Sequence, residues 1–217
     1  TTDTMYLETR VDELQKLKAI TDKYKDIVLN IRLGGTDFSS LYSLRRGIEF
    51  TIYDIITIRD CISDILNIFG RASENYTVSG VVWEYFSNNN RMLKPQLRET
   101  PFRKDGEQGL AKREIIISRE VDGLIKEVLL DKANGIIGKT IIHPTHIEYV
   151  NALQIVTYEE YTDAMNILNN QDKGVFKGDG GNKMNEVKPH YNWAKRIINR
   201  SNIYGVLNKD ENFTSLF

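Results

Sequence analysis

The sequence predicts an α/β protein built around a parallel sheet, on three observations. Apolar, β-branched runs alternate along the chain with segments of helical periodicity. A β-α-β order fits within the first 35 residues. The run IVLNIRLGG, residues 27–35, is almost continuously apolar before its glycines, as in strands that parallel sheets bury on both faces. Such a sheet is either doubly wound or closed as a barrel.

The first half of the chain supplies most of this alternation. We expect a short strand in TMYLET, ending at Glu8, and a helix whose apolar stripe includes Leu14 and Leu17. Residues 27–35 form the next strand. Residues 51–69 have the apolar spacing of a helix, and residues 76–86 are the next strand candidate.

The second half begins with a polar stretch containing prolines and glycines, residues 87–114, which we interpret as a loop or insertion. A helix follows and stops at Gly135, and GKTIIHP is a strand closed by proline. Thr145 with Glu148, and Thr157 with Glu160, have the spacing of capping boxes. The glycine-rich run 173–183 predicts a flexible connector, and the last helix spans Val187–Tyr204 with Gly205 as its cap.

Composition excludes several classes of function. The chain has 217 residues, of which 41% are hydrophobic, enough for a core. Its 29 basic and 30 acidic side chains give a net charge of −1, which disfavours a nucleic-acid or membrane-surface partner. No signal peptide is evident, so we expect a cytoplasmic protein, and we interpret the single cysteine, Cys61, as a core residue.

Two carboxylates stand at expected strand ends. Glu8 closes the first strand, and Asp37 follows the next one after Gly34 and Gly35. The carboxyl ends of adjacent parallel strands lie about 5 Å apart, so both carboxylates could bind one ion. Two carboxylates with several waters suit Mg²⁺ better than zinc. The alternative is that both residues only cap the helices that follow.

Three motifs in this order carry a resemblance: YLET, LGGTDFSS and NGIIGKTIIHPTHI. Together they resemble the HpcH/HpaI aldolase superfamily, in its citrate lyase β-subunit-like branch. The segments VSGVVWEYF, LKPQLRETPF and KMNEVKPHYNWAK resemble a sub-branch of TIM-barrel C–C bond lyases found in tellurite-resistance-type gene neighbourhoods. The resemblance covers almost the whole chain.

The resemblance implies a TIM-type (β/α)₈ barrel, of which this chain would be the C-terminal half. Residues 1–156 would supply strands 5–8, with an insertion near 87–114, and residues 157–217 would form a C-terminal helical extension. A half barrel leaves strand edges open. We therefore expect a homo-oligomer or a companion N-terminal half-barrel as partner.

The resemblance also implies a function. It predicts a Mg²⁺-dependent C–C bond lyase or aldolase that acts on a 2-oxo acid or an acyl-CoA through an enolate stabilised by the metal. Glu8 and Asp37 would be the metal ligands. The expected substrate-binding residues are Gly34, Gly35, Thr36, Arg45 and Lys139. The alternative is a non-catalytic binding or assembly subunit that keeps a partial barrel.

Several residues keep two interpretations. Lys139 either reaches an anion near the barrel mouth or is a solvated or carboxylate-paired lysine. Arg45 and Arg46 either contact phosphate or form an exposed pair on a helix. Glu186 either acts as a general acid in a neighbouring subunit, as the resemblance implies, or caps the last helix. We expect structural roles for His143 and His146.

Overall fold

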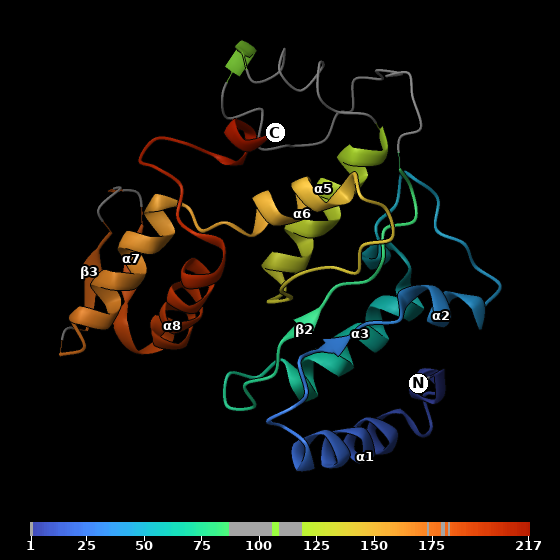
Figure 1. Ribbon diagram of the computed structural model, residues 1–217. Coiled ribbons are helices and arrows are strands. Elements are labelled where there is room, and N and C mark those ends of the chain that lie inside the picture. Colours follow the sequence, from blue (N-terminus) through green and yellow to red (C-terminus); the bar gives the residue numbers. More distant parts are fainter. Residues whose placement is uncertain (1, 87–105, 109–118, 173, 179–180, 182) are drawn as a thin grey trace. The chain divides into compact units, whose positions relative to one another are not determined.

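The chain folds as two units (Figure 1). The structure is a computed structural model that describes residues 2–86, 106–108, 119–172, 174–178, 181 and 183–217. The first unit holds the described residues up to 86 and residues 119–150. The second holds residues 106–108 and the described residues from 151 onwards. The sequence placed this division at residues 156 and 157.

Three successive extended segments form a parallel arrangement in the first unit. β1 (Ile31–Arg32) pairs in parallel with β2 (Val78–Ser79), with Ile31 opposite Val78. On the other side of β2, Gly80 forms a parallel bridge to Lys139. The predicted parallel pairing is therefore confirmed, but in segments much shorter than expected. The described residues form no closed barrel, which is compatible with a partial one.

Helices pack around these segments to form the core. α1 (Arg10–Lys23) and η2 (Ile52–Asp54) both contact α3 (Ile56–Phe69). α3 buries Cys61 completely, which confirms this thiol as a core residue. The apolar side chains of α3 share one cluster with Leu14 and Val78. Full burial of such a side chain contributes roughly 1.5–3 kcal/mol.

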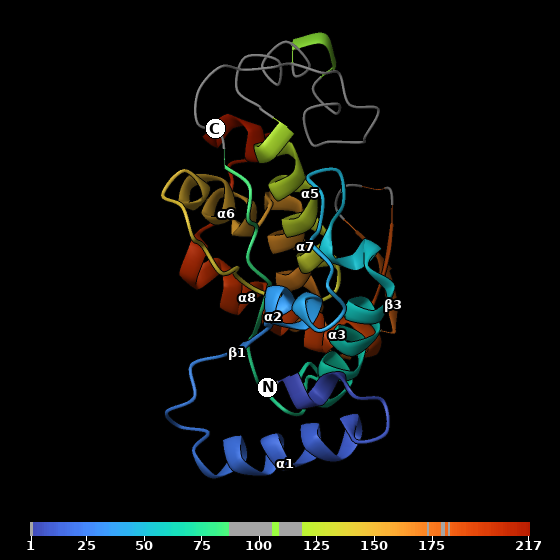
Figure 2. The ribbon, with the colours of Figure 1, turned by 90° about the vertical axis from the view of Figure 1, so that its right-hand side faces the viewer.

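Two further helices complete the first unit. α2 (Gly35–Ser40) follows β1 directly (Figure 2). α5 (Arg119–Ala133) ends before Gly135, whose φ of 77° suits glycine, as the sequence predicted.

The first expected strand is wrong. Residues Thr2–Met5 form the 3₁₀ helix η1, and Glu8 lies in the turn that follows. Arg10 explains why: its Nε donates to the carbonyl of Thr4 at 2.9 Å, and its Nη2 donates to the carbonyl of Met5 at 3.1 Å. These carbonyls are the groups that a strand would offer to a neighbouring strand. Met5 is nevertheless buried in the core.

The second unit is mainly helical. α6 (His146–Gln154) begins in the first unit, and α7 (Tyr158–Asn169) packs against α8 (Val187–Tyr204). The short helix η4 (Phe213–Leu216) lies near the end of the chain. The bounds of α8 are those expected, and Gly205 follows with a φ of 83°. The capping box of Thr157 and Glu160 is confirmed.

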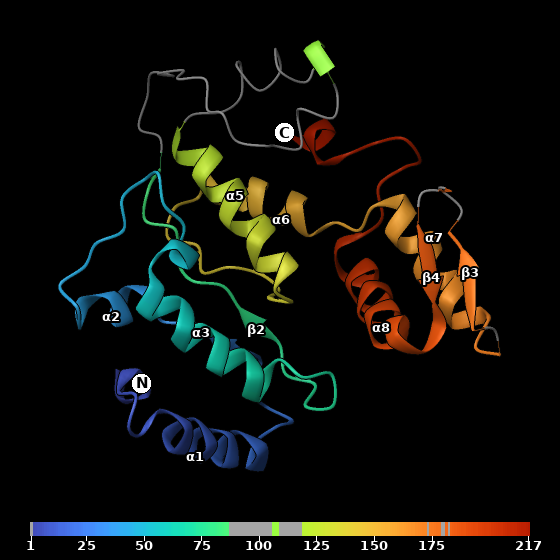
Figure 3. The ribbon, with the colours of Figure 1, turned by 180° about the vertical axis from the view of Figure 1, so that it is seen from behind.

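The glycine-rich connector is partly ordered as a hairpin. β3 (Val175–Lys177) pairs antiparallel with β4 (Met184–Glu186), which contacts α7 (Figure 3). The expectation of a flexible connector is wrong for these residues, because their backbone groups pair with each other. The predicted insertion, residues 87–114, lies outside the described residues except for 106–108. Within the described part of the chain, no helix has the length and apolar character needed to span a membrane.

We predict that Gly123→Ala destabilises the protein although alanine is the better helix former. A Cβ atom at Gly123, inside α5, would lie 2.3 Å from Cζ2 of the buried Trp83. The clash should outweigh the gain in helix propensity and lower the free energy of unfolding by about 1–3 kcal/mol. Urea denaturation measures this change. Gly47→Ala is the control, since its Cβ would lie 3.5 Å from Phe50; equal effects of the two changes would contradict the packing argument.

Candidate functional site

Asp37 lies at the carboxyl edge of the parallel segments. It occupies the first turn of α2, directly after β1, and is exposed. The preceding Thr36 donates its hydroxyl proton to Oε1 of Glu84 at 3.2 Å. Glu84 lies five residues after the end of β2, so this bond joins the segments that follow two neighbouring strands. The sequence predicted Asp37 and Thr36 at this edge but missed Glu84.

The glycine pair allows a close turn at this edge. A Cβ atom at Gly35 would lie 2.7 Å from Cγ1 of Val81, closer than real contacts allow. A Cβ atom at Gly34 would lie 3.0 Å from Oδ2 of Asp37. Gly35 therefore brings the start of α2 against the segment after β2, and Gly34 leaves room for the Asp37 carboxylate.

Lys139 lies in a buried charge cluster, which also contains Glu127, Asp131, Tyr53, Arg46 and Glu84. Its Nζ donates to Oε1 of Glu127 at 2.8 Å and to Oδ2 of Asp131 at 2.9 Å, and these three side chains are at most 1% exposed. Tyr53 donates its hydroxyl proton to Oδ1 of Asp131 at 2.5 Å. Of the two interpretations of Lys139, the structure contains the carboxylate-paired one.

Arg46 connects this cluster to the carboxyl edge. Its guanidinium forms ion pairs with both Glu127 and Glu84 and donates to the carbonyl of Val82 at 2.8 Å. Its Cζ also lies 4.7 Å from the centre of the Trp83 ring, a cation–π distance. The cluster thus extends from the α5 side of the sheet to Glu84.

The two arginines that the sequence paired have different environments. Arg46 is buried, whereas Arg45 is exposed. Neither lies in a helix, so the expectation of an exposed helical pair is wrong. The carboxylates of the buried charge cluster explain the difference, because they compensate the charge of Arg46 in the interior.

Burial shifts the proton equilibria of the buried charge cluster. Desolvation raises the pKa of the Asp131 carboxyl group above its ordinary value. Desolvation also raises the pKa of the Tyr53 phenol, and the nearby Asp131 carboxylate raises it further. Tyr53 is therefore a hydrogen-bond donor at neutral pH, and it stabilises the carboxylate that it contacts.

A polar contact lies on the face of the parallel segments that points away from Lys139 and α5. Successive side chains of an extended segment point to opposite faces, so Thr140 points away from its neighbour Lys139. Arg32 of β1 donates from Nε to the Thr140 hydroxyl at 3.1 Å. Arg32 is exposed, which places a cation on the face away from α5.

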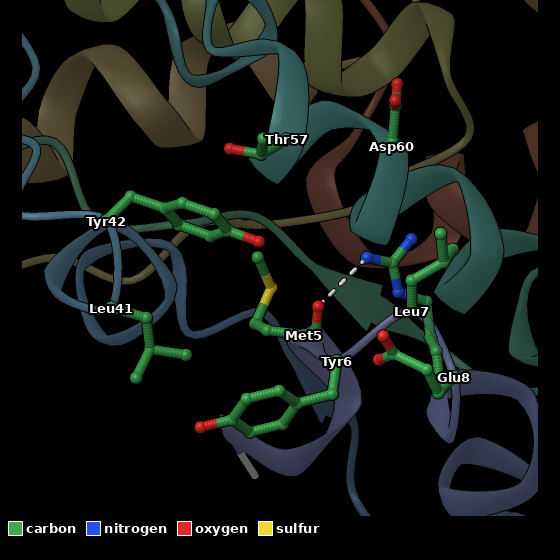
Figure 4. A pocket seen from close by; sticks show the side chains of 9 residues that line it. Met5, Tyr6, Leu7, Glu8, Leu41, Tyr42, Thr57 and Asp60 are labelled. Atoms are coloured by element: carbon green, nitrogen blue, oxygen red, sulfur yellow. Dashed lines mark hydrogen bonds between the residues drawn. The ribbon is translucent and has the colours of Figure 1, made fainter.

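A pocket of 510 Å³ lies beside η1 and contains Glu8. Apolar and aromatic side chains form much of its wall: Met5, Tyr6, Leu7, Leu41 and Tyr42. Its polar lining consists of Glu8, Arg10, Thr57 and Asp60. Figure 4 shows Leu41 and Tyr42 on one side of the pocket and Leu7 and Glu8 on the other.

Glu8 and Asp37 are the carboxylates that the sequence predicted as ligands of one divalent cation, and carboxylate oxygens are ligands that Mg²⁺ accepts. The expected placement at adjacent strand ends is wrong for Glu8, which lies in a turn. The described residues contain no group of three or more His, Cys, Asp or Glu side chains that could hold a metal ion. Mg²⁺ does not require such a group, because one or two carboxylates with waters and substrate oxygens suffice. Both carboxylates are exposed. η1, just before Glu8, contacts α2, which carries Asp37.

The two histidines of the IHP motif differ in burial. His146 is 2% exposed, and its Nε2 lies 3.0 Å from the carbonyl oxygen of Tyr85. A carbonyl only accepts, so Nε2 carries the proton. His143 is only partly buried and stacks on Phe86, with ring centres 4.1 Å apart. Thr145 contacts Nδ1 of His143 at 2.9 Å and precedes α6.

Glu186 lies in the second unit, at the N-terminal end of α8. It is exposed, and its backbone N–H donates to Nδ1 of His190 at 3.1 Å. Next to it, Asn185 is buried and donates to Oδ1 of Asp163 at 2.9 Å. Lys183 also pairs with Asp163, at 2.6 Å. Glu186 occupies the N-cap position of α8, but its side chain makes no capping hydrogen bond. The polar group buried beside it was missed.

A sequence signal for the buried charge cluster existed. Glu127 and Asp131 are four residues apart, and Leu124 and Val128 belong to the same apolar helical stripe. Acidic residues within an apolar stripe indicate buried carboxylates, which require partners. No comparable signal identified the pocket, because its walls come from three separate segments.

Comparisons with known proteins place the chain in a family. A family model described as C–C bond lyases of the TIM-barrel fold matches residues 1–206. No curated protein and no solved structure matches the chain.

We predict that His146 makes the stability of the protein depend on pH. Burial lowers the pKa of His146 below its ordinary value of 6.5, so the unfolded state takes up the proton first as pH falls. Stability should therefore decrease from about pH 7 to about pH 5. Urea denaturation of His146→Gln at several pH values should give a flatter profile than the wild type. The less buried His143 provides the control: His143→Gln should keep the wild-type slope, and an unchanged slope in His146→Gln would contradict the prediction.

Proposed function

We propose, since the chain belongs to the family of C–C bond lyases of the TIM-barrel fold, that it breaks or forms a carbon–carbon bond next to an oxo group. The family match over residues 1–206 is the observation that carries this proposal. The parallel segments support it, because enzymes of this fold place their chemistry at the carboxyl ends of the strands. Asp37 and Glu84 follow two such ends.

The proposed reaction proceeds through an enolate and depends on Mg²⁺. Bound Mg²⁺ would polarise the oxo group and stabilise the negative charge that develops as the bond breaks. Asp37 and Glu8 are the carboxylates that we assign as its ligands. Gly34 and Gly35 contribute by shaping the turn, so that Asp37 is presented at the edge. Thr36 positions the same turn through its bond to Glu84.

The cationic residues have different proposed roles. Arg45 is exposed and is the candidate for contact with an anionic part of the substrate. Lys139 is enclosed by two carboxylates, so we assign it a positioning role through the buried charge cluster. Arg46 extends this role to Glu84, because it pairs with that carboxylate.

The second unit contributes the proposed general acid, Glu186. Its exposed position at the start of α8 leaves the carboxyl group accessible to a neighbouring subunit. We also propose a homo-oligomer or a companion N-terminal half-barrel. Large apolar side chains before β1 support such a partner: Ile27 is 80% exposed and Leu29 is 88% exposed.

The substrate is a 2-oxo acid or an acyl-CoA in this proposal.

A non-catalytic binding or assembly subunit is the second candidate function. The separate positions of Glu8, in a turn, and Asp37, after a strand, favour it. Metal dependence separates the two. A lyase of this kind requires the divalent cation for turnover, whereas an assembly subunit does not.

We predict that Asp37→Asn weakens Mg²⁺ binding by more than about tenfold, because it removes a charged oxygen ligand. Isothermal titration calorimetry measures the affinity. Circular dichroism should show an intact fold, since the Asp37 side chain is exposed. Asp26→Asn makes the same change at another exposed aspartate and should leave the affinity unchanged. Equal affinities in wild type and Asp37→Asn would contradict the assignment.

A further inference from the structure

The pocket beside η1 has the size and wall chemistry of a small-molecule site. Its volume of 510 Å³ lies within the range of about 300–1,000 Å³ that is usual for ligand pockets. Four of its large side chains are strongly exposed: Leu7 at 78%, Tyr6 at 57%, Leu41 at 43% and Tyr42 at 42%. Single exposed apolar residues are ordinary, but their grouping around one concave surface indicates a ligand.

Among the described residues, the cation that lines the pocket is already paired with a carboxylate. Arg10 is the one cationic side chain among the described residues that line it. Each of its three guanidinium nitrogens already donates to a protein oxygen: Nε to Thr4, Nη2 to Met5 and Nη1 to the carboxylate of Asp64. Nearby Arg59 pairs with Asp60 at 3.2 Å.

The remaining polar groups also disfavour an anion. Glu8 and Asp60 contribute carboxylates to the lining. The hydroxyl oxygen of Thr57 is buried and has no hydrogen-bond partner among the residues that the structure describes. Thr57 carries no charge, so it does not compensate an anion. A second carboxylate or a phosphate would meet like charge without compensation.

We infer that this pocket binds the apolar, uncharged body of the substrate, so that the enzyme acts on a monocarboxylic 2-oxo acid with an aromatic or branched aliphatic chain. Di- and tricarboxylic acids are poor occupants because their additional acid group would enter this pocket. The 2-oxo acid part of this inference rests on the proposed function. The preference for an uncharged apolar body rests on the pocket alone.

The pocket is tested first without metal, using 3-phenylpropanol and 3-phenylpropionate as probes in ligand-observed NMR titrations. The alcohol has the apolar body without an acid group and cannot chelate a metal. We expect the alcohol to bind at least about tenfold more tightly than the acid. Equal affinities, tighter binding of the acid, or no binding of the alcohol would overturn the inference.

Variants locate the binding. Leu41→Asp places a charge in the pocket wall and should weaken 3-phenylpropanol binding at least about tenfold. Leu7→Asp provides a second test at a side chain exposed enough for the fold to tolerate the change. Ile203→Asp, at an exposed isoleucine outside the pocket, should bind like the wild type. Unchanged binding in both pocket variants would overturn the assignment.

The proposed function is tested separately with Mg²⁺ present. Phenylpyruvate should then bind more tightly than oxaloacetate, and Mg²⁺ should strengthen the binding of phenylpyruvate. If Mg²⁺ has no effect while 3-phenylpropanol still requires the pocket wall, the metal-dependent lyase fails and the pocket assignment holds. If Mg²⁺ strengthens binding but oxaloacetate binds more tightly, the lyase holds and the substrate class inferred from the pocket is wrong.

Discussion

The buried ion pairs of Lys139 are the interaction on which the first unit depends. Lys139 joins an extended segment to Glu127 and Asp131 of α5, and Glu127 also pairs with Arg46. Buried charges are stable only when each has its partner, so α5, this segment and the chain around Arg46 hold one another in place. Arg46 in turn pairs with Glu84, whose other oxygen accepts the Thr36 hydroxyl beside Asp37. The carboxyl edge is thus connected through the partly exposed Glu84 to charges that are buried in the core.

The residues that support the edge differ from those proposed to take part in the reaction. The buried charge cluster contains the strongly perturbed Asp131 and Tyr53, but their burial points to a structural role. Asp37 and Glu8 are exposed carboxylates, and these are the groups that we propose as metal ligands. Membership in the TIM-barrel C–C bond lyase family gives these carboxylates their proposed use, and the apolar pocket next to Glu8 gives the substrate its proposed shape.

Local patterns predicted the helices well, whereas long-range contacts decided what the sequence missed. The helical stripe and Gly205 gave the bounds of α8, because both signals lie within the helix and its cap. The strand expected at Glu8 failed because Arg10, only a few residues further on, binds the carbonyls of Thr4 and Met5. Glu84 could not be predicted as a site residue, since its partners are about 40 residues or more away. Lys139 was predicted as a substrate-binding residue. Its burial could not be predicted, because it results from packing against α5.

The free energy of unfolding of Lys139→Met tests most directly whether the buried charge cluster holds this unit together. Methionine keeps the apolar length of the side chain and removes its charge, which leaves Glu127 and Asp131 without one of their cations. The loss should be about 3–5 kcal/mol in urea denaturation at neutral pH, as expected when one member of a buried ion pair is removed. A variant as stable as the wild type would contradict the claim, because it would show that the carboxylates do not need Lys139.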